Sequence, residues 1–226
     1  PAVSRAESRS TTEVAELLIR RDGIDKDLAL KSARQAQNHV GMARRLAGSQ
    51  DARARRAETL REISSITNLS RAMLAAEKLL GVAKRDAEAL AKERDTAEKE
   101  HLMRAFGLAV DERIPPNLRP QFKDLEENQK RRNTRALRDG IDRIFTDAES
   151  FFRDVISLQL QANAELTNED LIAELNLRVY GTSVDDNIAV LDAITEARKR
   201  LASNVRDLLV LESLCTRMIL RQDVAA

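Results

Sequence analysis

Apolar residues recur at helical spacing over two long stretches of this chain. Over 68–106 and again over 121–161, they follow one another at alternating intervals of four and three residues, with one interruption at Arg94 in the first stretch. This spacing places them on one face of an α-helix. We therefore predict two long helices, each with one apolar seam. The predicted seams consist of Leu69, Met73, Ala76, Leu80, Ala83, Ala87, Leu90 and Ala97 in the first helix and of Leu137, Ile141, Ile144, Ala148, Phe151, Val155 and Leu158 in the second.

The stretch between these helices is predicted to be a linker. Residues 107–120 read GLAVDERIPPNLRP and carry three of the four prolines of the chain. Proline lacks an N–H and interrupts helices. We therefore expect the two long helices to form an antiparallel hairpin over 68–161 that buries both seams.

The first 48 residues carry the start and stop signals of three short helices. A serine and a glutamate three residues apart form a capping box before the first apolar stripe. Glycines end the first and third helices, and an asparagine, which tolerates the left-handed conformation, ends the second. The expected boundary residues are Ser10 with Glu13, Gly23, Asp25, Asn38 and Gly48.

Shorter helices are expected in the rest of the chain. Leu175, Leu177 and Val179 alternate with polar residues, which leaves a short strand open as an alternative, although no second strand is predicted to pair with it. The fold class is therefore predicted to be all-α. The expected elements are an arginine-rich connecting helix at 51–62, a break at 63–67, and helices at about 168–180, 184–202 and 205–221.

The last of these helices is apolar on every side. At about 100° per residue, the apolar side chains of VRDLLVLESLCTRMIL (205–220) cover the whole circumference. Such a helix must be enclosed, either by its own domain or by a partner chain. Its charged residues exclude a membrane span, which needs roughly 20 apolar residues. We expect it to lie near a contact with partner chains, through an interface formed by Leu208, Leu211, Leu214 and Met218.

Composition narrows the function classes. The 226 residues include 38 Lys and Arg against 37 Asp and Glu, so no net field attracts nucleic acid or anionic lipid. The single cysteine, Cys215, cannot form an intrachain disulfide and is expected to be a small core residue, which fits a reducing cytoplasm. The chain begins at Pro1, without Met, which suggests a processed or truncated product.

Motifs for catalysis and cofactor binding are not found. The sequence has no GxxxxGK[ST], GxGxxG or HExxH motif. Its two histidines, His39 and His101, lie on different predicted elements, as a helix-start residue and a solvated residue. Two basic clusters, 53–56 and 130–138, are interpreted as solvated helix faces with ion pairs, with DNA contact or protein contact as alternatives.

Several segments resemble bacterial clamp-loader subunits. The last helix is similar to their collar helix, in which an asparagine precedes a Leu-x-Leu-Glu-x-Leu core, and the first 48 residues look like an AAA+ lid domain. The resemblance rests on Asn204-Val205 with Leu209-Val210-Leu211-Glu212-Ser213-Leu214, on Phe151-Phe152-Arg153-Asp154-Val155, on Thr134-Arg135 with Arg138-Asp139, on Asn168-Glu169-Asp170-Leu171, and on Ala33-Arg34 with Asn38-His39-Val40-Gly41-Met42-Ala43-Arg44-Arg45-Leu46.

Together these segments resemble the delta-prime subunits of bacterial DNA polymerase III, in the version with an extra-long, alanine-rich hairpin. The resemblance implies an AAA+ lid over 1–48, a connecting helix over 49–66 and a collar over 67–226. It also implies a non-catalytic, cytoplasmic protein without cofactor or metal. The collar would pack against other clamp-loader subunits and support loading of the sliding clamp, touching DNA only through the assembled loader.

Two departures from the family pattern matter. In ATP-hydrolysing relatives, the third lid helix offers an arginine that senses nucleotide phosphate. Here Gly41 occupies that position and Arg44 follows one turn later, which implies a lid that does not sense ATP. The nucleotide-binding domain that would precede the lid does not occur in the sequence, and Pro1 falls about where it would end.

Two other functions fit the residues. The first is a helical adaptor or scaffold whose long hairpin pairs with a partner coiled coil, and it needs nothing beyond amphipathic helices. The second is a DNA-binding module that uses the basic residues of 53–61 or 130–138, and it predicts duplex affinity that falls steeply with salt.

Overall fold

The computed structural model describes residues 10–110, 112–203 and 205–219, and the regular elements of that part are all helices, with no strand. The helix that contains Leu175 and Leu177 is regular, so the alternative of a strand there is wrong. The α-helices are α1 Thr11–Asp22, α2 Lys26–Gln35, α3 Val40–Gly48, α4 Gln50–Ser64, α5 Leu69–Ala105, α6 Arg119–Gln159, α7 Ile172–Gly181, α8 Val184–Ala202 and α9 Asp207–Arg217, and a 3-10 turn, η1, spans Glu169–Leu171.

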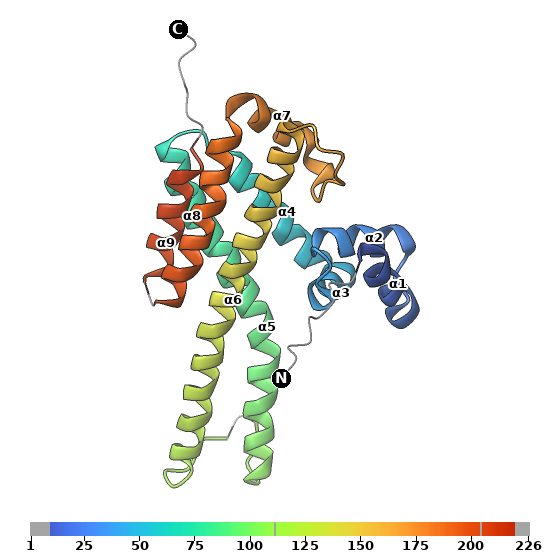
Figure 1. Ribbon diagram of the computed structural model, residues 1–226. Coiled ribbons are helices and arrows are strands. Elements are labelled where there is room, and N and C mark those ends of the chain that lie inside the picture. Colours follow the sequence, from blue (N-terminus) through green and yellow to red (C-terminus); the bar gives the residue numbers. More distant parts are fainter. Residues whose placement is uncertain (1–9, 111, 204, 220–226) are drawn as a thin grey trace, which may run out of the picture.

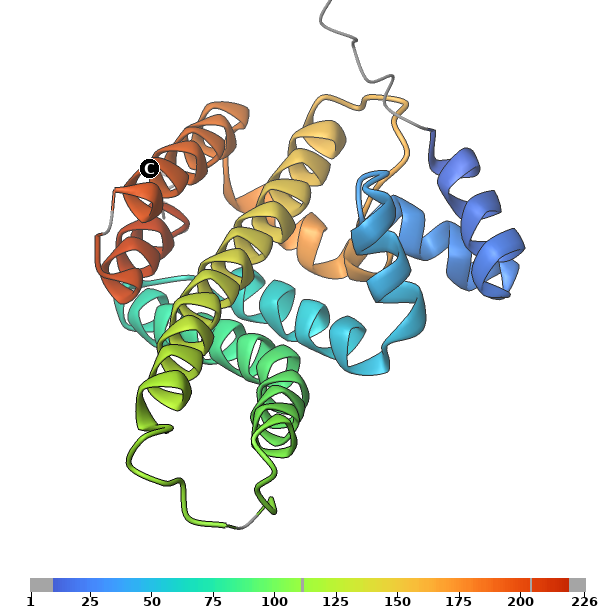
Figure 2. The same cartoon turned by 90° about the horizontal axis from the view of Figure 1, so that it is seen from below.

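The long hairpin of α5 and α6 dominates the shape of the molecule. Its 37 and 41 residues correspond to about 55 and 60 Å at 1.5 Å per residue, and its far half projects away from the other helices (Figure 1). Seen along the hairpin, α8 and α9 lie on one side of α6, and α1–α3 lie on the other (Figure 2). The predicted hairpin is confirmed, with its proline linker between the two helices.

Two separate hydrophobic clusters hold the fold together. The small one joins α1, α2, α3 and the start of α4, around Val14, Leu18 and Leu46. The large one joins the near half of the hairpin with α4, α7, α8 and α9, around Phe145, Phe151 and Phe152. Helix α4 contributes to both clusters, so it connects the small bundle to the hairpin.

The caps predicted for the small bundle are present. Ser10 and Glu13 form the capping box of α1. Gly23 and Asn38 both adopt the left-handed conformation, each with φ of 65°, and Asp25 caps α2. The connecting helix differs from the prediction because α4 continues through Ile63, whose side chain is buried.

The α6 seam is confirmed, whereas the α5 seam is only half correct. Ala76, Ala83 and Ala87 are buried as predicted. Leu69 is 60% exposed and Ala97 is exposed, so their assignment to the seam is wrong. The side chain of Leu90 lies outside the described residues, as do 1–9, 204 and 220–226, which the predicted domains include.

The two long helices approach most closely at Gly140. A Cβ atom on this residue would lie 3.2 Å from the backbone oxygen of Ala83 and 3.3 Å from its Cβ atom. Distances this short force the neighbour to move, so glycine permits this crossing. Among the described residues, no helix has the length and apolarity that crossing a membrane requires.

Candidate functional site

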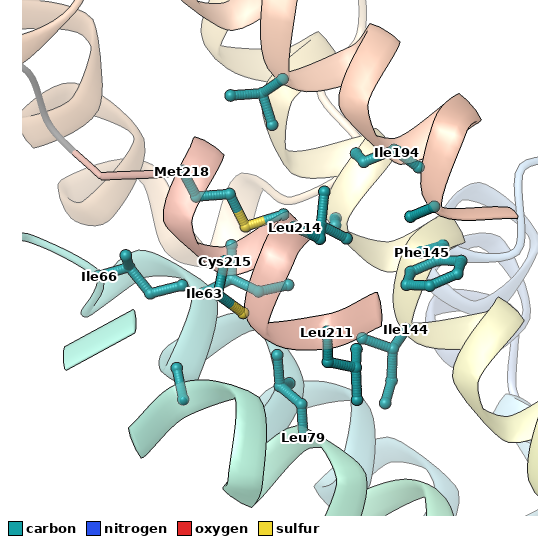
Figure 3. Packing of buried hydrophobic residues seen from close by; sticks show 14 of the residues in the cluster. Ile63, Ile66, Leu79, Ile144, Phe145, Ile194, Leu211, Leu214, Cys215 and Met218 are labelled. Carbon is teal, nitrogen blue, oxygen red and sulfur yellow. The ribbon is translucent and has the colours of Figure 1, made fainter. Parts of the chain in front are cut away.

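The last helix, α9, is enclosed by this chain itself. Leu211, Leu214 and Met218 are 0%, 3% and 1% exposed, and Figure 3 shows them within the large cluster. They therefore offer no surface to another protein, and the predicted interface is wrong at these three positions. The side chains around them are Ile63, Ile66, Leu79, Ile144, Phe145, Ile194 and Cys215.

The outward side of α9 consists of different residues. Leu208, the fourth residue of the predicted interface, is half-buried and packs against the large cluster. Leu209 is 52% exposed and Val205, just before the helix, is 38% exposed. Neighbours within the chain explain the apolar character of the other sides, because α5 and α8 both pack against α9.

One aspartate on the hairpin forms ion pairs with three arginines from three other helices. Asp86 of α5 pairs with Arg45 of α3, Arg55 of α4 and Arg143 of α6, and Arg55 Nε lies 2.8 Å from Asp86 Oδ1. The Asp86 side chain is only 9% exposed. This carboxylate therefore ties the small bundle, the connecting helix and both arms of the hairpin to one point.

Opposing effects act on the charge of this carboxylate. Burial disfavours the ionised form of Asp86, but the positive charges of Arg143 and Arg45 outweigh burial and hold its pKa below the ordinary value. Burial also lowers the pKa of Arg45, against the attraction of Asp86. Both groups stay ionised at neutral pH, so the contact is an ion pair.

The next residue of α4 belongs to a second buried cluster. Arg56 is 7% exposed. Its Nε lies 3.1 Å from Asp147 Oδ1, and its Nη2 donates to Asn168 Oδ1 at 2.5 Å. Burial raises the pKa of Asp147 to about 6, although Arg56 acts in the opposite direction.

The segment after α6 is fixed by side chains on α6. The amide of Asn168 donates to Asp154 Oδ2 at 2.8 Å and to Ser150 Oγ at 3.1 Å. Asp154 also accepts the backbone N–H groups of Thr167 and Asn168 at 3.0 and 2.7 Å. Burial raises the pKa of Asp154, and these hydrogen bonds oppose the rise.

The small bundle also reaches this segment directly. Arg34 of α2 pairs with Glu165 and Glu169, and Arg34 Nη1 lies 2.7 Å from Glu169 Oε2. Lys31 Nζ lies 3.2 Å from Asp170 Oδ2. Since these side chains are partly exposed, each pair contributes little alone; together they define a second edge of contact between the two clusters.

We call this region, centred on Asp86, Arg56 and Asn168, the polar junction. It surrounds a cavity of about 250 Å³ between α2, α3, α4, α5 and α6. Its charged groups already contact one another, with three arginines on Asp86 and Arg56 on Asp147, and they come from helices that are far apart in the sequence. What this arrangement does is hold two helical bundles at a fixed orientation.

One stretch in the far half of the hairpin has a polar interior, between the buried Ala91 and the buried Met103 and Phe122 nearer the tip. Arg132 of α6 pairs with Glu98 of α5, with Arg132 Nη1 donating to Glu98 Oε1 at 2.8 Å. Asn133 Nδ2 donates to Asp95 Oδ2 at 3.0 Å, and Gln129 Nε2 donates to the backbone oxygen of Asp95 at 3.0 Å. The true inward positions here are therefore Asp95 and Glu98, one residue beyond the apolar seam predicted from the sequence.

The two basic clusters have different roles. Arg53 Nη1 donates to the backbone oxygens of Leu46 and Ala47 at the end of α3, while Arg55 and Arg56 belong to the polar junction. The interpretation of 53–56 as a solvated face is thus wrong. In the second cluster, Arg131 is exposed and its Nη2 lies 3.7 Å from Glu127 Oε2, as expected of a solvated face with i,i+4 pairs.

The remaining candidate residues are separate from one another. His39 Nδ1 accepts the N–H of Met42 and caps α3, as predicted, and His101 is exposed on α5. Cys215 is buried, which confirms its assignment to the core, and burial raises its pKa to about 12. In the described part of the chain, no group of three or more His, Cys, Asp or Glu side chains is placed to hold a metal ion.

Sequence reasoning missed the polar junction. Asp86 sits among Lys84, Arg85 and Glu88 and looks like any other charge on a helix surface. Asn168 follows a stretch without helical periodicity. Its position in one of the segments that resemble clamp-loader subunits is the one feature of the sequence that points to a special role for this residue. Comparison with known proteins found no matching family model, no matching curated protein and no matching solved structure.

Proposed function

We propose that the chain is a non-catalytic assembly module, the lid and collar part of a clamp-loader subunit of the delta-prime type. The observation that carries this proposal is the polar junction, which fixes a three-helix bundle to a larger helical bundle. A subunit that transmits no nucleotide-driven motion needs such a fixed connection.

The clamp-loader-like segments support the proposal by their positions. Asp154 and Asn168 belong to two different segments of this kind, and they bind each other at 2.8 Å. Arg34 and Arg45 belong to the lid-like segments and make ion pairs across the junction. Residues that carry the resemblance therefore also hold the two bundles together.

The proposal is tested by reconstitution. The chain is mixed with purified delta and gamma or tau subunits from the same bacterium, and the masses of the complexes are measured by native mass spectrometry. We expect a complex that contains the chain, the delta subunit and the gamma or tau subunit. If the chain binds neither, the clamp-loader proposal is wrong.

One observation favours the adaptor as a second candidate. In the far half of the hairpin, a groove of about 480 Å³ runs between α5 and α6, over Ala87, Ala91 and Leu137. Alanines allow a third helix to approach closely. The adaptor function predicts that a hairpin variant such as Ala91→Arg abolishes binding of the partner, whereas assembly into a loader through the collar is unchanged.

A further inference from the structure

The outer face of α7 carries three exposed large apolar residues. Ile172, Leu177 and Tyr180 are 44%, 74% and 89% exposed, and Ala173 and Asn176 are exposed between them. At 100° per residue, these five positions cover about 140° of the helix. This face bears no charged residue. We call these five residues the α7 face.

The opposite side of α7 is firmly anchored. Leu175 is fully buried, and the guanidinium of Arg178 lies 5.1 Å from the ring centre of Phe152. Arg178 Nη1 donates to the backbone oxygen of Ile66 at 3.3 Å, and Nη2 donates to that of Met218. The α7 face is therefore held in one orientation before any partner binds, which lowers the entropic cost of docking.

A further exposed apolar residue lies at the end of α6. Gln159 Nε2 donates to the backbone oxygens of Val179 and Thr182 at 3.4 and 2.7 Å, which holds the ends of α6 and α7 together. The next residue, Leu160, is 61% exposed. Exposed apolar patches on a protein surface mark interaction sites.

Carboxylates lie at both ends of the α7 face. Between 159 and 192 the chain carries seven Asp and Glu, of which Glu165, Glu169 and Asp170 pair with Arg34 and Lys31 of α2. The one basic residue of this stretch, Arg178, is buried. Glu174 lies in the first turn of α7 and Asp185 in the first turn of α8, so carboxylates flank the face at both ends. A partner that buries these apolar residues also meets a negative rim.

We propose that the α7 face docks a basic amphipathic helix of another protein, with Leu177 and Tyr180 entering its apolar stripe and Glu174 and Asp185 facing its lysines or arginines. Helix-to-surface recognition of this type places apolar anchors at the centre and charges at the rim. An anionic membrane surface is disfavoured by the same carboxylates. The proposal does not depend on the clamp-loader function, so failed assembly with loader subunits leaves it standing.

The test uses a fluorescein-labelled amphipathic peptide of 18 residues, with a leucine stripe and lysines on the other face. A control peptide has the same leucines but glutamates in place of the lysines. Binding to the full chain is followed by fluorescence anisotropy at low and at raised salt. We expect the lysine peptide to bind and the glutamate peptide not to bind, with affinity falling as salt rises because rim charges are screened.

Variants locate the binding site. Leu177→Ser with Tyr180→Ser is expected to weaken binding by about tenfold, as the loss of two central anchors does. Glu174→Lys with Asp185→Lys weakens binding and removes most of its salt dependence. The matched control is Leu209→Ser, another exposed leucine, which leaves the affinity within about twofold because it lies outside the site. Unchanged urea midpoints show that the variants remain folded.

Several outcomes would overturn the proposal. The first is that the lysine peptide and the glutamate peptide bind equally well. The second is that the Leu177→Ser, Tyr180→Ser variant binds the lysine peptide as tightly as the unmodified protein. The third is that Leu209→Ser weakens binding as much as this double variant. A dimer of the chain that disappears in the double variant would assign the α7 face to self-association. Binding to phosphatidylserine vesicles that disappears in this variant would assign it to a membrane.

Discussion

The helices α9 and α7 show how differently one chain uses its apolar residues. Most of the apolar residues of helix α9 are covered by its own chain, with Leu211 and Cys215 fully buried, although Leu209 stays 52% exposed. In helix α7, Arg178 and Glu174 interrupt the apolar pattern, and the large side chains of Leu177 and Tyr180 are exposed to solvent. An apolar pattern therefore shows that a helix needs cover, and only the arrangement of the other helices shows whether the chain supplies it.

The largest effect is expected from charging the enclosed helix. Leu211→Asp places a carboxylate without a partner in the large cluster, which costs more than about 4 kcal/mol and unfolds much of the protein. Leu177→Asp on α7 is the matched control and changes the free energy of unfolding by less than about 0.5 kcal/mol. Urea unfolding followed by circular dichroism measures both. Equal losses would remove the distinction between the two helices.

The contrast between enclosed and open positions extends to charges. Asp86→Asn leaves three arginines around a neutral amide and is expected to cost about 3 kcal/mol, as when one partner of a buried pair is removed. Glu58 pairs with Arg85 in solvent, with Arg85 Nη2 2.6 Å from Glu58 Oε1. Glu58→Gln is therefore the control and should cost at most about 0.5 kcal/mol. A mild effect of Asp86→Asn would show that the polar junction is not a structural anchor.

Two glycines on the hairpin sharpen the comparison further. Gly140→Val inserts side-chain atoms against Ala83 at the closest approach of α5 and α6, and we expect a loss of about 2 kcal/mol from overpacking. A Cβ on Gly81 would contact only the mobile end of Arg85, at 3.4 Å. Gly81→Ala should therefore stabilise by up to about 1 kcal/mol through helix propensity. Thermal unfolding of both variants decides whether the crossing requires glycine.

The smallest effect concerns pH. The pKa of Asp147 is about 6 in the folded protein, above its ordinary value of 3.8. Between these values the folded state binds more protons than the unfolded state, so the contribution of Asp147 to stability falls as pH rises from about 4 to 6. Asp147→Asn removes this contribution. Relative to the unmodified protein, the variant should gain about 2 kcal/mol between pH 4 and pH 7. A constant difference across this range would contradict the raised pKa.

Local signals in the sequence predicted the helices well. Ser10, Gly23 and Asn38 act through their own backbone and nearest neighbours, so their capping roles follow from the residues alone. The bounds of α8 and the α6 seam follow from periodicity in the same way. These features made the all-α class and the hairpin predictable.

Features that depend on distant parts of the chain were not predictable. The three arginines of Asp86 lie on three other helices, so nothing near Asp86 in the sequence marks it. Asp95 and Glu98 face α6, but the pattern of apolar residues does not predict this, because charged residues normally mark the solvent-facing side of a helix. The predicted interface at Leu211 was wrong for a related reason, since periodicity says nothing about which chain provides the cover.

The two halves of the hairpin have a mechanical consequence. Near Gly140, apolar contacts and the glycine crossing hold α5 and α6 together, while further out Arg132, Asn133 and their carboxylate partners join the arms by polar contacts. Met103 and Phe122 are buried again closer to the tip. Water and salt compete with the polar contacts. Backbone amides around Asp95 and Arg132 should therefore exchange with deuterium sooner than those beside Gly140, so the hairpin is stiff at its base and yields along this polar stretch.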